Sequence, residues 1–587
     1  MAAALATLLA PLNIWFSAVN KAVKEPYLDE VFHVRQAQHY CNGNFEIWDP
    51  KITTPPGLYV LSYLVQPTLG CSITSLRAIN AVCLILLLLA LRATYYVRRE
   101  ANNEKGSVSG LLATHSSLNM VLFPPLFFFS ALYYTDIAST LSVTIFYWYF
   151  LRTLPNKRST FVQGAIQVLL GLISLTFRQT NIFWVAVAPA ALMLVVELDR
   201  GHRVVKDSMY KKAAGFGDNV FSVAKTSWKM EVIYDPPIRD AWFEDFFRTI
   251  VSIAACACKA ATQPQRILDL VTALAPYITL IASFAAFILW NGSVVLGDKS
   301  NHTATINLPQ ILYLWPFITF FSWPLLLPHF ALLPLTILSR IGELTHLEPL
   351  LIFRRRYFLP RLSLIATFIA LALALVHFNT IVHPFLLADN RHFHFYIFRR
   401  LLRPWWVRYA VTPIYIITAW ACIETRGEPV PSPKAATGLN HTAKSQGTAD
   451  TLPPRETTDF ERRACLPDGK SSSTVSFTLV SLATTALSLC TAPLVEPRYC
   501  IIPFIIWRMH LPLYTLDEHA ASGARSDPSK AKSGKGRTWK AFLEAYDWRV
   551  VAETVWFLAI NAVTGYIFIN WGFEWPQEPG VVQRFMW

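Results

Sequence analysis

The sequence predicts an all-α membrane protein that crosses the bilayer many times. Apolar runs close to 20 residues long recur along its 587 residues, and a run of that length can span a bilayer as a helix. Charged residues make up 15% of the chain and hydrophobic residues 53%, with a mean hydropathy of +0.35. Soluble domains carry roughly a quarter charged residues. We therefore expect residues 1–587 to form one polytopic membrane domain rather than three or four soluble domains.

The apolar runs indicate 12 to 14 spans. The candidates are residues 2–19, 76–97, 118–133, 136–153, 162–177, 180–197, 269–290, a Pro-interrupted run between 310 and about 338, 362–378, 409–423, 475–494, 499–515 and 550–571. The shorter run Gly57–Leu69 is expected to lie in the membrane interface or to re-enter. Only then do the basic clusters between spans all face the cytosol.

The basic loops set the expected orientation of the chain, because positive charge gathers in cytosolic loops. The net charge of +14 lies in short loops and linkers between apolar runs, which argues against a nucleic-acid surface. The cytosolic side receives a basic loop at 199–268, where short amphipathic helices are expected. It also receives two polar linkers at 425–472 and 517–540, which we expect to be disordered. The first loop, residues 20–75, then faces the opposite side, although Lys21 and Lys24 argue mildly against this.

Other polar features collect on the same non-cytosolic side. The sequons at Asn291 and Asn301 fall there and could be glycosylated, whereas the sequon at Asn440 falls in a cytosolic linker and should not be. Cys41 and Cys71 could form a disulfide if both face an oxidising compartment. The loops carrying Asp136, Arg178, Asp298, Lys299 and Arg498 also lie on this side.

Residues 25–40 contain the first cluster of candidate catalytic groups. Pro26 suits the first turn of a helix, and Asn42-Gly43 suits its end. On such a helix Asp29, His33 and Gln36 share one face, with Glu30 beside Asp29. Acidic residues are also favoured in first helical turns for the helix dipole alone. We favour a chemical role because further polar motifs join this segment on the same side.

The loop after this helix, residues 48–59, is rich in prolines, and we expect most of it to be a structural turn. Asp49 could order this loop or contact a sugar hydroxyl.

Residues 377–403 form the second cluster. It contains the histidines and polar residues of 383–392, and the arginines 399, 400 and 403 follow. Arginines on the non-cytosolic side run against the usual charge bias, and binding of an anionic lipid phosphate would explain them. Alternatively, Arg399, Arg400 and Arg403 could extend to ordinary headgroups from an interfacial helix. For His383, Asp389, Asn390, Arg391 and His392 we favour ligand binding.

Several motifs of nucleotide and hydrolase sites are missing. The chain has no GxxxxGK[ST], GxGxxG, GxSxG, HExxH or Asp-x-Asp motif. We therefore expect no metal site, no cofactor and no nucleotide donor. Transport is disfavoured, because the predicted spans are nearly free of charge and show no repeat.

Five stretches resemble one enzyme family. They are 26–33 (PYLDEVFH), 48–57 (WDPKITTPPG), 291–300 (NGSVVLGDKS), 383–392 (HPFLLADNRH) and 584–587 (RFMW). The chain is similar along nearly its whole length to the dolichyl-phosphate-glucose-dependent α-1,2-glucosyltransferases of N-glycan precursor assembly in the endoplasmic reticulum. The linkers 425–472 and 517–540 resemble nothing in this family.

This resemblance implies a GT-C membrane fold and transfer of a third, terminal glucose in the ER lumen. The donor would be dolichyl-phosphate-glucose, the acceptor the diglucosylated dolichyl-diphosphate oligosaccharide, and the surroundings ER membrane lipids. Protein partners are not implied. Because the donor is the β anomer, an α product means inversion, with one carboxylate as general base. The base is expected in the first luminal loop, at Asp29 or Glu30, and we favour Asp29.

The same resemblance suggests where the substrates bind. Asp136, Asp298 and Asp389 are candidates for acceptor binding. Arg498 could contact phosphate or simply pair with Glu496. The nearest alternative is another dolichyl-phosphate-sugar transferase of the same fold, such as a mannosyltransferase, which would lack the 388–392 stretch. A polytopic transporter is a more distant one.

Overall fold

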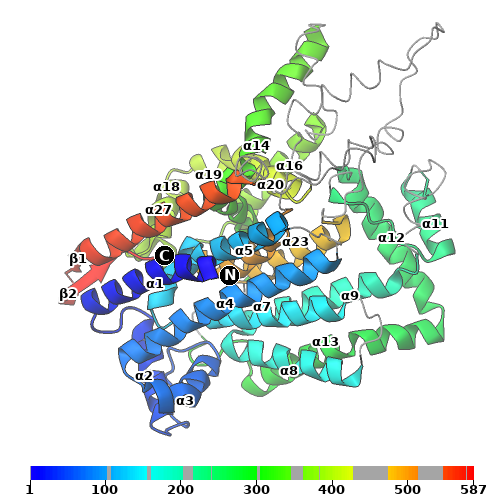
Figure 1. Ribbon diagram of the computed structural model, residues 1–587. Coiled ribbons are helices and arrows are strands. Elements are labelled where there is room, and N and C mark those ends of the chain that lie inside the picture. Colours follow the sequence, from blue (N-terminus) through cyan, green and yellow to red (C-terminus); the bar gives the residue numbers. More distant parts are fainter. Residues whose placement is uncertain are drawn as a thin grey trace, which may run out of the picture.

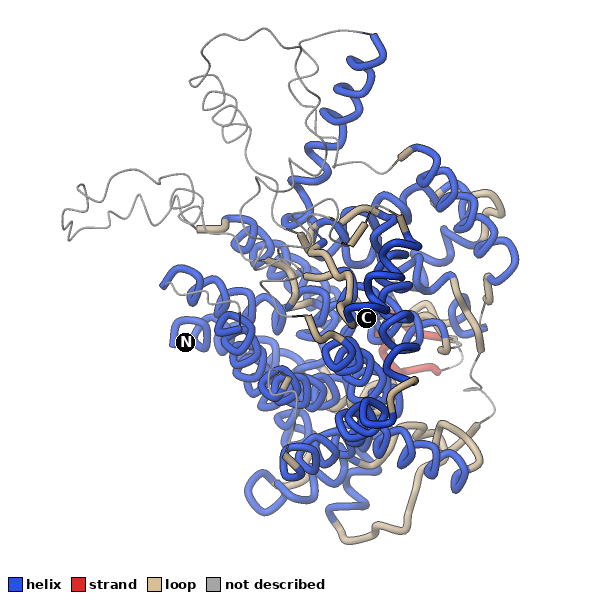
Figure 2. Tube along the Cα trace, turned by 90° about the vertical axis from the view of Figure 1, so that its right-hand side faces the viewer, coloured by secondary structure: helices blue, strands red, loops and turns tan. Residues whose placement is uncertain are grey.

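The computed structural model describes residues 2–101, 107–154, 160–201, 216–217, 219–238, 241–299, 305–345, 361–382, 384–427, 473–492, 494–512, 546–576 and 578–587. Helices make up nearly all of this part of the chain, and the two named strands form a single small hairpin (Figure 2). The predicted all-α membrane fold is confirmed. The linker residues 428–472 and 517–540 lie outside the described residues.

The elements follow one another with short connections. The helices are α1 Ala2–Ala22, α2 Glu30–Cys41, α3 Gly57–Leu69, α4 Ile73–Ala101, α5 Ser107–Leu122, α6 Pro124–Phe128, α7 Asp136–Thr153, α8 Phe161–Phe177, α9 Ala188–Leu198, α11 Val220–Met230, α12 Phe243–Ala261, α13 Pro264–Asn291, α14 Pro309–Thr345, α16 Leu362–Asn379, α17 Pro384–Ala388, α18 Phe393–Leu402, α19 Val407–Ala410, α20 Thr412–Glu424, α23 Val475–Cys490, α24 Ile501–Met509 and α27 Trp548–Asn570. The strands β1 Gly572–Trp575 and β2 Glu578–Arg584 pair antiparallel.

Seven helices in the described residues are long and apolar enough to cross a membrane, or nine if each of two bent pairs is one span. The bent pairs are Gly110–Leu122 with Pro124–Ala131, at 61°, and Phe393–Leu402 with Val407–Glu424, at 98°. Two shorter apolar helices, Phe161–Phe177 and Val475–Cys490, also match predicted spans. The count of 12 to 14 spans stays a prediction, because several predicted spans are realised as short or broken helices.

The core lies around α7, which packs closely against α4 and α8. Thirteen of its 18 residues are buried, and they include polar residues such as Ser139, Thr140 and Thr144. These hydroxyls bond to carbonyls one turn earlier or to Asn181, so a buried polar helix is satisfied within the bundle. The helix begins with a buried carboxylate, Asp136, which is paired with Arg178.

The bundle presents different elements at its two ends (Figure 1). The helices α2 and α3 and the β1–β2 hairpin lie at the left end of that view, whereas α11 and α12 lie at the right. The separation agrees with the prediction that 20–75 and 199–268 face opposite sides. The predicted amphipathic helices of 199–268 are present as α11 and α12. Each has a buried side and exposed apolar residues such as Trp228 and Phe247.

Two local features differ from the prediction. The helix of the first cluster begins at Glu30 rather than near Pro26, because Leu28 has φ +55° and breaks the backbone before Asp29. Its predicted end at Asn42-Gly43 is confirmed, with Gly43 at φ +78°. The β1–β2 hairpin was not predicted from an all-α pattern.

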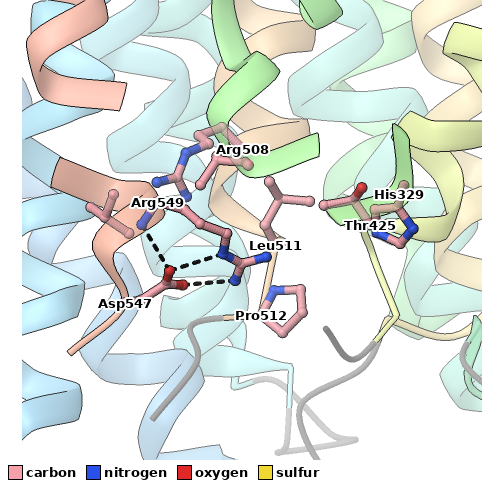
Figure 3. Close-up of a pocket in the computed structure, with 9 residues that line it drawn as sticks. His329, Thr425, Arg508, Leu511, Pro512, Asp547 and Arg549 are labelled. Carbon is pink, nitrogen blue, oxygen red and sulfur yellow. Dashed lines mark hydrogen bonds and ion pairs between the residues drawn. The ribbon is translucent and has the colours of Figure 1, made fainter. Parts of the chain in front are cut away.

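The predicted spans are also not free of charge. Arg508 and Glu553 form a buried ion pair at 2.7 Å between α24 and α27. This pair lies beside a small hollow lined by Arg508, Asp547 and Arg549, with His329 and Thr425 opposite (Figure 3). The 23 residues of α27 separate the hollow from the hairpin, a rise of about 34 Å. It is therefore remote from the candidate site.

Candidate active site

Asp29 lies at the N-cap of α2, and its carboxylate is half exposed. Its Oδ2 lies 3.2 Å from the Arg498 guanidinium, which also bonds Glu496 at 2.8 Å. Loss of hydration raises the pKa of Asp29, but the charges of Arg498, His33 and His392 lower it by more. The net pKa lies below the ordinary value, so this exposed carboxylate is ionised at neutral pH.

Glu30, the next residue, is fully buried. Arg77 donates two hydrogen bonds to its two oxygens, both at 2.7 Å, and the backbone N–H groups of Tyr27 and Tyr133 donate two more. Arg77 in turn donates to backbone carbonyls at the end of α1. The carboxylate therefore joins α1, α2, α4 and the loop before α7, and none of its surface faces solvent. This geometry argues against the role of general base that was open for Glu30.

His33 lies one helical turn after Asp29, on the same side of α2, as predicted. Its Nδ1 lies 2.6 Å from the Tyr59 hydroxyl, and its ring packs against Tyr134. Burial lowers the pKa of His33 to about 4, although Asp29 opposes the shift. The imidazole is thus neutral at pH 7, so it does not replace Arg498 as the charged partner of the Asp29 carboxylate.

Gln36 does not join this polar face. It is fully buried, donates to the carbonyl of Ile47 at 2.6 Å and accepts from the N–H of Asp49 at 2.9 Å. The Asp49 carboxylate accepts from the N–H of Lys51, which closes a tight turn. Of the two roles open for Asp49, ordering the loop is the one its contacts support.

Asp136 begins α7 and pairs with Arg178 at 3.0 Å. The Asp136 side chain is buried, and the Arg178 side chain is 17% exposed. Arg178 lies over the ring of Tyr499, next to Arg498. Asp136 and Arg178 therefore lie near Arg498, the partner of Asp29, on the side predicted for them.

The second cluster is a compact group of hydrogen-bonded side chains from residues 389–392, which we call the 389–392 knot. Arg391 donates through Nε and Nη2 to the two oxygens of Asp389, at 2.9 and 2.7 Å. The guanidinium also lies 4.2 Å from the centre of the Trp575 ring and donates to Gln583 at 3.2 Å. These contacts hold the pKa of Asp389 below its ordinary value against the effect of burial. Much of the hydrogen-bonding capacity of Arg391 is used within the protein.

His392 and Asn390 connect this knot to the hairpin segment. His392 Nδ1 lies 3.2 Å from the carbonyl oxygen of Trp587, and its Nε2 lies 3.7 Å from Asp389. Asn390 accepts from the indole N–H of Trp575 at 3.0 Å. The backbone of 391–393 pairs with Met586 in both directions.

The two clusters meet, as predicted. His392 is close enough to lower the pKa of Asp29. Tyr27 ties the end of α1 to the hairpin, because its hydroxyl accepts from the N–H of Arg584 and donates to its carbonyl. The first loop, the 389–394 segment and residues 584–587 are thus linked by hydrogen bonds, although they lie far apart in the sequence.

The remaining predicted site residues lie outside this cleft or outside the described residues. Lys299 bonds the carbonyl of Asn291 at 2.5 Å, and the N–H of Asp298 bonds that of Pro50. Gly297, at φ +61°, lies so close to the carbonyls of Pro50 and Ile52 that a Cβ would collide with them at 2.5 Å. The 291–299 loop is therefore a brace under the 48–56 loop. His383 lies outside the described residues.

Sequence reasoning missed several residues that build the site. Arg77 was read as part of an apolar span, although an arginine there is itself a signal of a buried partner. Tyr27, Tyr134 and Trp575 are aromatic residues without a pattern that distinguishes them from core residues. Among the described residues, no group of three or more His, Cys, Asp or Glu side chains is arranged to hold a metal ion.

Comparison with known proteins gives a consistent result. A family model described as the DIE2/ALG10 family matches residues 23–509. A protein of Emericella nidulans named "Dol-P-Glc:Glc(2)Man(9)GlcNAc(2)-PP-Dol alpha-1,2-glucosyltransferase" is 40% identical, over 98% of this chain and 96% of its own. A protein of the same name from Aspergillus fumigatus is 37% identical, over 99% and 96%, and one from Homo sapiens is 28% identical, over 97% and 95%.

Among solved structures, the archaeal oligosaccharyltransferase AglB of Archaeoglobus fulgidus aligns with 96% of this chain and 55% of its own. The identity is 13% and the TM-score 0.29. The family model covers most of the chain, and the relatives align from end to end. This chain belongs to the DIE2/ALG10 family.

Proposed function

We propose that this protein is an inverting glucosyltransferase of the ER membrane. It moves glucose from dolichyl-phosphate-glucose to the diglucosylated dolichyl-diphosphate oligosaccharide and forms the terminal α-1,2 linkage. The names of relatives up to 40% identical support the reaction. The single structural observation that carries the proposal is an ionised, half-exposed Asp29 held by Arg498.

Asp29 acts as the general base. Its carboxylate takes the proton of the acceptor 2-hydroxyl as that oxygen attacks C1 of glucose. The bond from C1 to the phosphate oxygen breaks with its electron pair, and dolichyl phosphate leaves. Arg498 holds the Asp29 carboxylate by direct contact and is itself paired with Glu496. Such positioning of two bound substrates supplies much of the rate of a transfer reaction.

The charges around Asp29 are unequal. The carboxylates of Asp29, Asp136 and Glu496 face only Arg178 and Arg498, so this part of the site is net negative. The proton of the acceptor hydroxyl is attracted to this part, which supports transfer of that proton to Asp29.

Two observations support a lumenal site. Cys41 and Cys71 form a disulfide beside the cleft, and disulfides persist in oxidising compartments such as the ER lumen. In addition, the site and the 199–268 loop lie at opposite ends of the bundle (Figure 1), as the predicted placement of basic loops in the cytosol requires.

The test is an assay of the purified enzyme with synthetic dolichyl-phosphate-glucose and a diglucosylated acceptor. The product should be triglucosylated, and dolichyl-phosphate-mannose should not replace the donor. Asp29→Asn should lower kcat by about 10² to 10⁴, the usual contribution of a general base. Glu46→Gln, which removes an exposed carboxylate of the same loop, is the matched control and should retain activity. Full activity of Asp29→Asn would exclude Asp29 as the base, and transfer of mannose would overturn the assigned donor.

A further inference from the structure

Three arginines of α18 form a cationic surface that the proposed chemistry does not use. Arg399, Arg400 and Arg403 are exposed and, with Tyr396 and Pro404, line an open hollow of about 390 Å³. Positions 396, 399, 400 and 403 follow the spacing of one helical face. We call these three side chains the arginine triad.

The charge of the arginine triad is not neutralised locally. Among the described residues, none of its members forms an ion pair, whereas Arg391 is held by Asp389 and Arg498 by Glu496. No acidic residue occurs between 391 and 423 in the sequence. Three adjacent guanidinium groups repel one another, so an arrangement that keeps them on one face favours a ligand with several negative charges.

The position of the triad relative to Asp29 restricts which phosphate it can contact. His394, in the first turn of α18, stacks on His392 at the edge of the cleft. Arg399 and Arg403 lie five and nine residues further, a rise of about 7 and 13 Å along the helix axis. In an inverting displacement the donor phosphate leaves from the face of C1 opposite Asp29, and until then it is bonded directly to that carbon. A second phosphate group, further from the reacting carbon, fits the triad better.

The surroundings of the triad place that second group on a lipid. Trp405 and Trp406 follow directly and are 74% and 56% exposed, and exposed tryptophans mark the membrane interface. The acceptor is anchored in the same membrane as the donor, so its glycan must fold back to bring its terminal glucose to Asp29. Its diphosphate then lies at the membrane surface, to one side of the cleft.

We propose that the arginine triad binds the diphosphate of the lipid-linked acceptor. The acceptor is then recognised by its diphosphate, independently of its sugars. This inference rests on the proposed function. Arg399 and Arg403, one turn apart on the same face, can each fork onto one of two neighbouring phosphates, and Arg400 adds charge from the adjacent position. A monophosphate would engage only part of this arrangement.

The experiment compares R399Q/R400Q/R403Q with wild type in detergent, using three acceptors with the same diglucosylated glycan. One is linked through a lipid diphosphate, one through a lipid monophosphate, and one carries no phosphate. For the diphosphate acceptor, the KM should rise at least about tenfold, the effect of losing one charge-assisted hydrogen bond. The kcat and the donor KM should change less than about twofold, and the KM for the phosphate-free acceptor should not change.

The matched control is K21Q/K24Q/R35Q, which removes three exposed positive charges from α1, α2 and the loop between them. It should leave the acceptor KM unchanged. R399K/R400K/R403K should restore only part of the affinity, because lysine keeps the charge but cannot fork onto phosphate. Thermal unfolding of each variant checks that it folds.

Three outcomes would overturn the inference. An unchanged acceptor KM would remove the triad from substrate binding, and a rise in donor KM alone would assign it to the donor phosphate. A loss that appears only in anionic vesicles, and equally for all three acceptors, would make it a general contact with membrane lipids. In each case wild-type activity would still support the proposed function, whereas an inactive wild type would reject that function itself.

Discussion

Glu30 accepts four hydrogen bonds inside the protein, whereas the carboxylate of its neighbour Asp29 is half exposed and contacts one arginine. A base must reach the substrate and must be able to give up its own partner. Removing Glu30 from its contacts would leave Arg77 as an unpaired buried charge, which is very costly. At the scale of single residues, burial therefore separates a structural carboxylate from a chemical one.

Glu30→Gln should destabilise the protein by about 3 to 5 kcal/mol, the cost of removing one partner of a buried ion pair. The expected signs are a lower unfolding temperature and a lower yield of folded protein. The kcat per folded molecule should fall far less than in Asp29→Asn. Asp29→Asn, by contrast, should unfold close to the wild-type temperature. A stable but inactive Glu30→Gln would instead indicate that Glu30 is the base.

Arg498→Gln should change the pH dependence of the reaction. Arg498 lowers the pKa of Asp29, so in the wild type the base stays ionised to a pH below the ordinary aspartate range. Without this cation, one of the groups that lower the pKa of Asp29 is lost and the pKa rises. The acid limb of the kcat/KM profile should therefore shift to higher pH. An acid limb at the wild-type pH would show that Arg498 does not tune this carboxylate.

At the scale of elements, the site depends on braces that hold α2 in place. The disulfide between Cys41 and Cys71 joins the end of α2 to the segment before α4. Gln36 bonds to the backbone of Ile47 and Asp49. The 291–299 loop donates backbone hydrogen bonds to the carbonyls of Pro50 and Thr53, directly after that turn. The family-like motifs at 48–57 and 291–300 thus lie against each other for structural reasons, with Gly297 required at their contact.

Cys71→Ser should destabilise α2 and the first loop. Breaking a cross-link over 30 residues is expected to cost about 3 to 4 kcal/mol by the loop-closure relation. Thermal unfolding of Cys71→Ser should occur at a lower temperature than that of Cys83→Ser, which changes a buried thiol outside the disulfide. Equal unfolding temperatures would show that the cross-link contributes little to this loop.

At the scale of the whole molecule, the two ends of the bundle carry different tasks. One end holds α2, α3 and the β1–β2 hairpin, and the other holds α11 and α12 (Figure 1). Such a division suits a protein whose substrates are both confined to one membrane surface.

A glycosylation reporter placed near residue 300 should be modified in microsomes, and one placed near 440 should remain unmodified. The expectation follows from the positions of the basic loops and from the disulfide at the site end. Glycosidase-sensitive gel shifts provide the measurement. The opposite pattern would invert the orientation and place Asp29 in the cytosol.

The sequence by itself determined the membrane class, the family and the stretch that holds Asp29 and Glu30, and it predicted a shared side for the polar loops. Hydrophobic length, charge bias and long motifs are local in the chain, so they can be read without coordinates. It could not separate Asp29 from Glu30, assign Gln36 and Lys299 to braces or find Arg77 and Trp575. These depend on burial and on partners hundreds of residues away, which only tertiary packing decides.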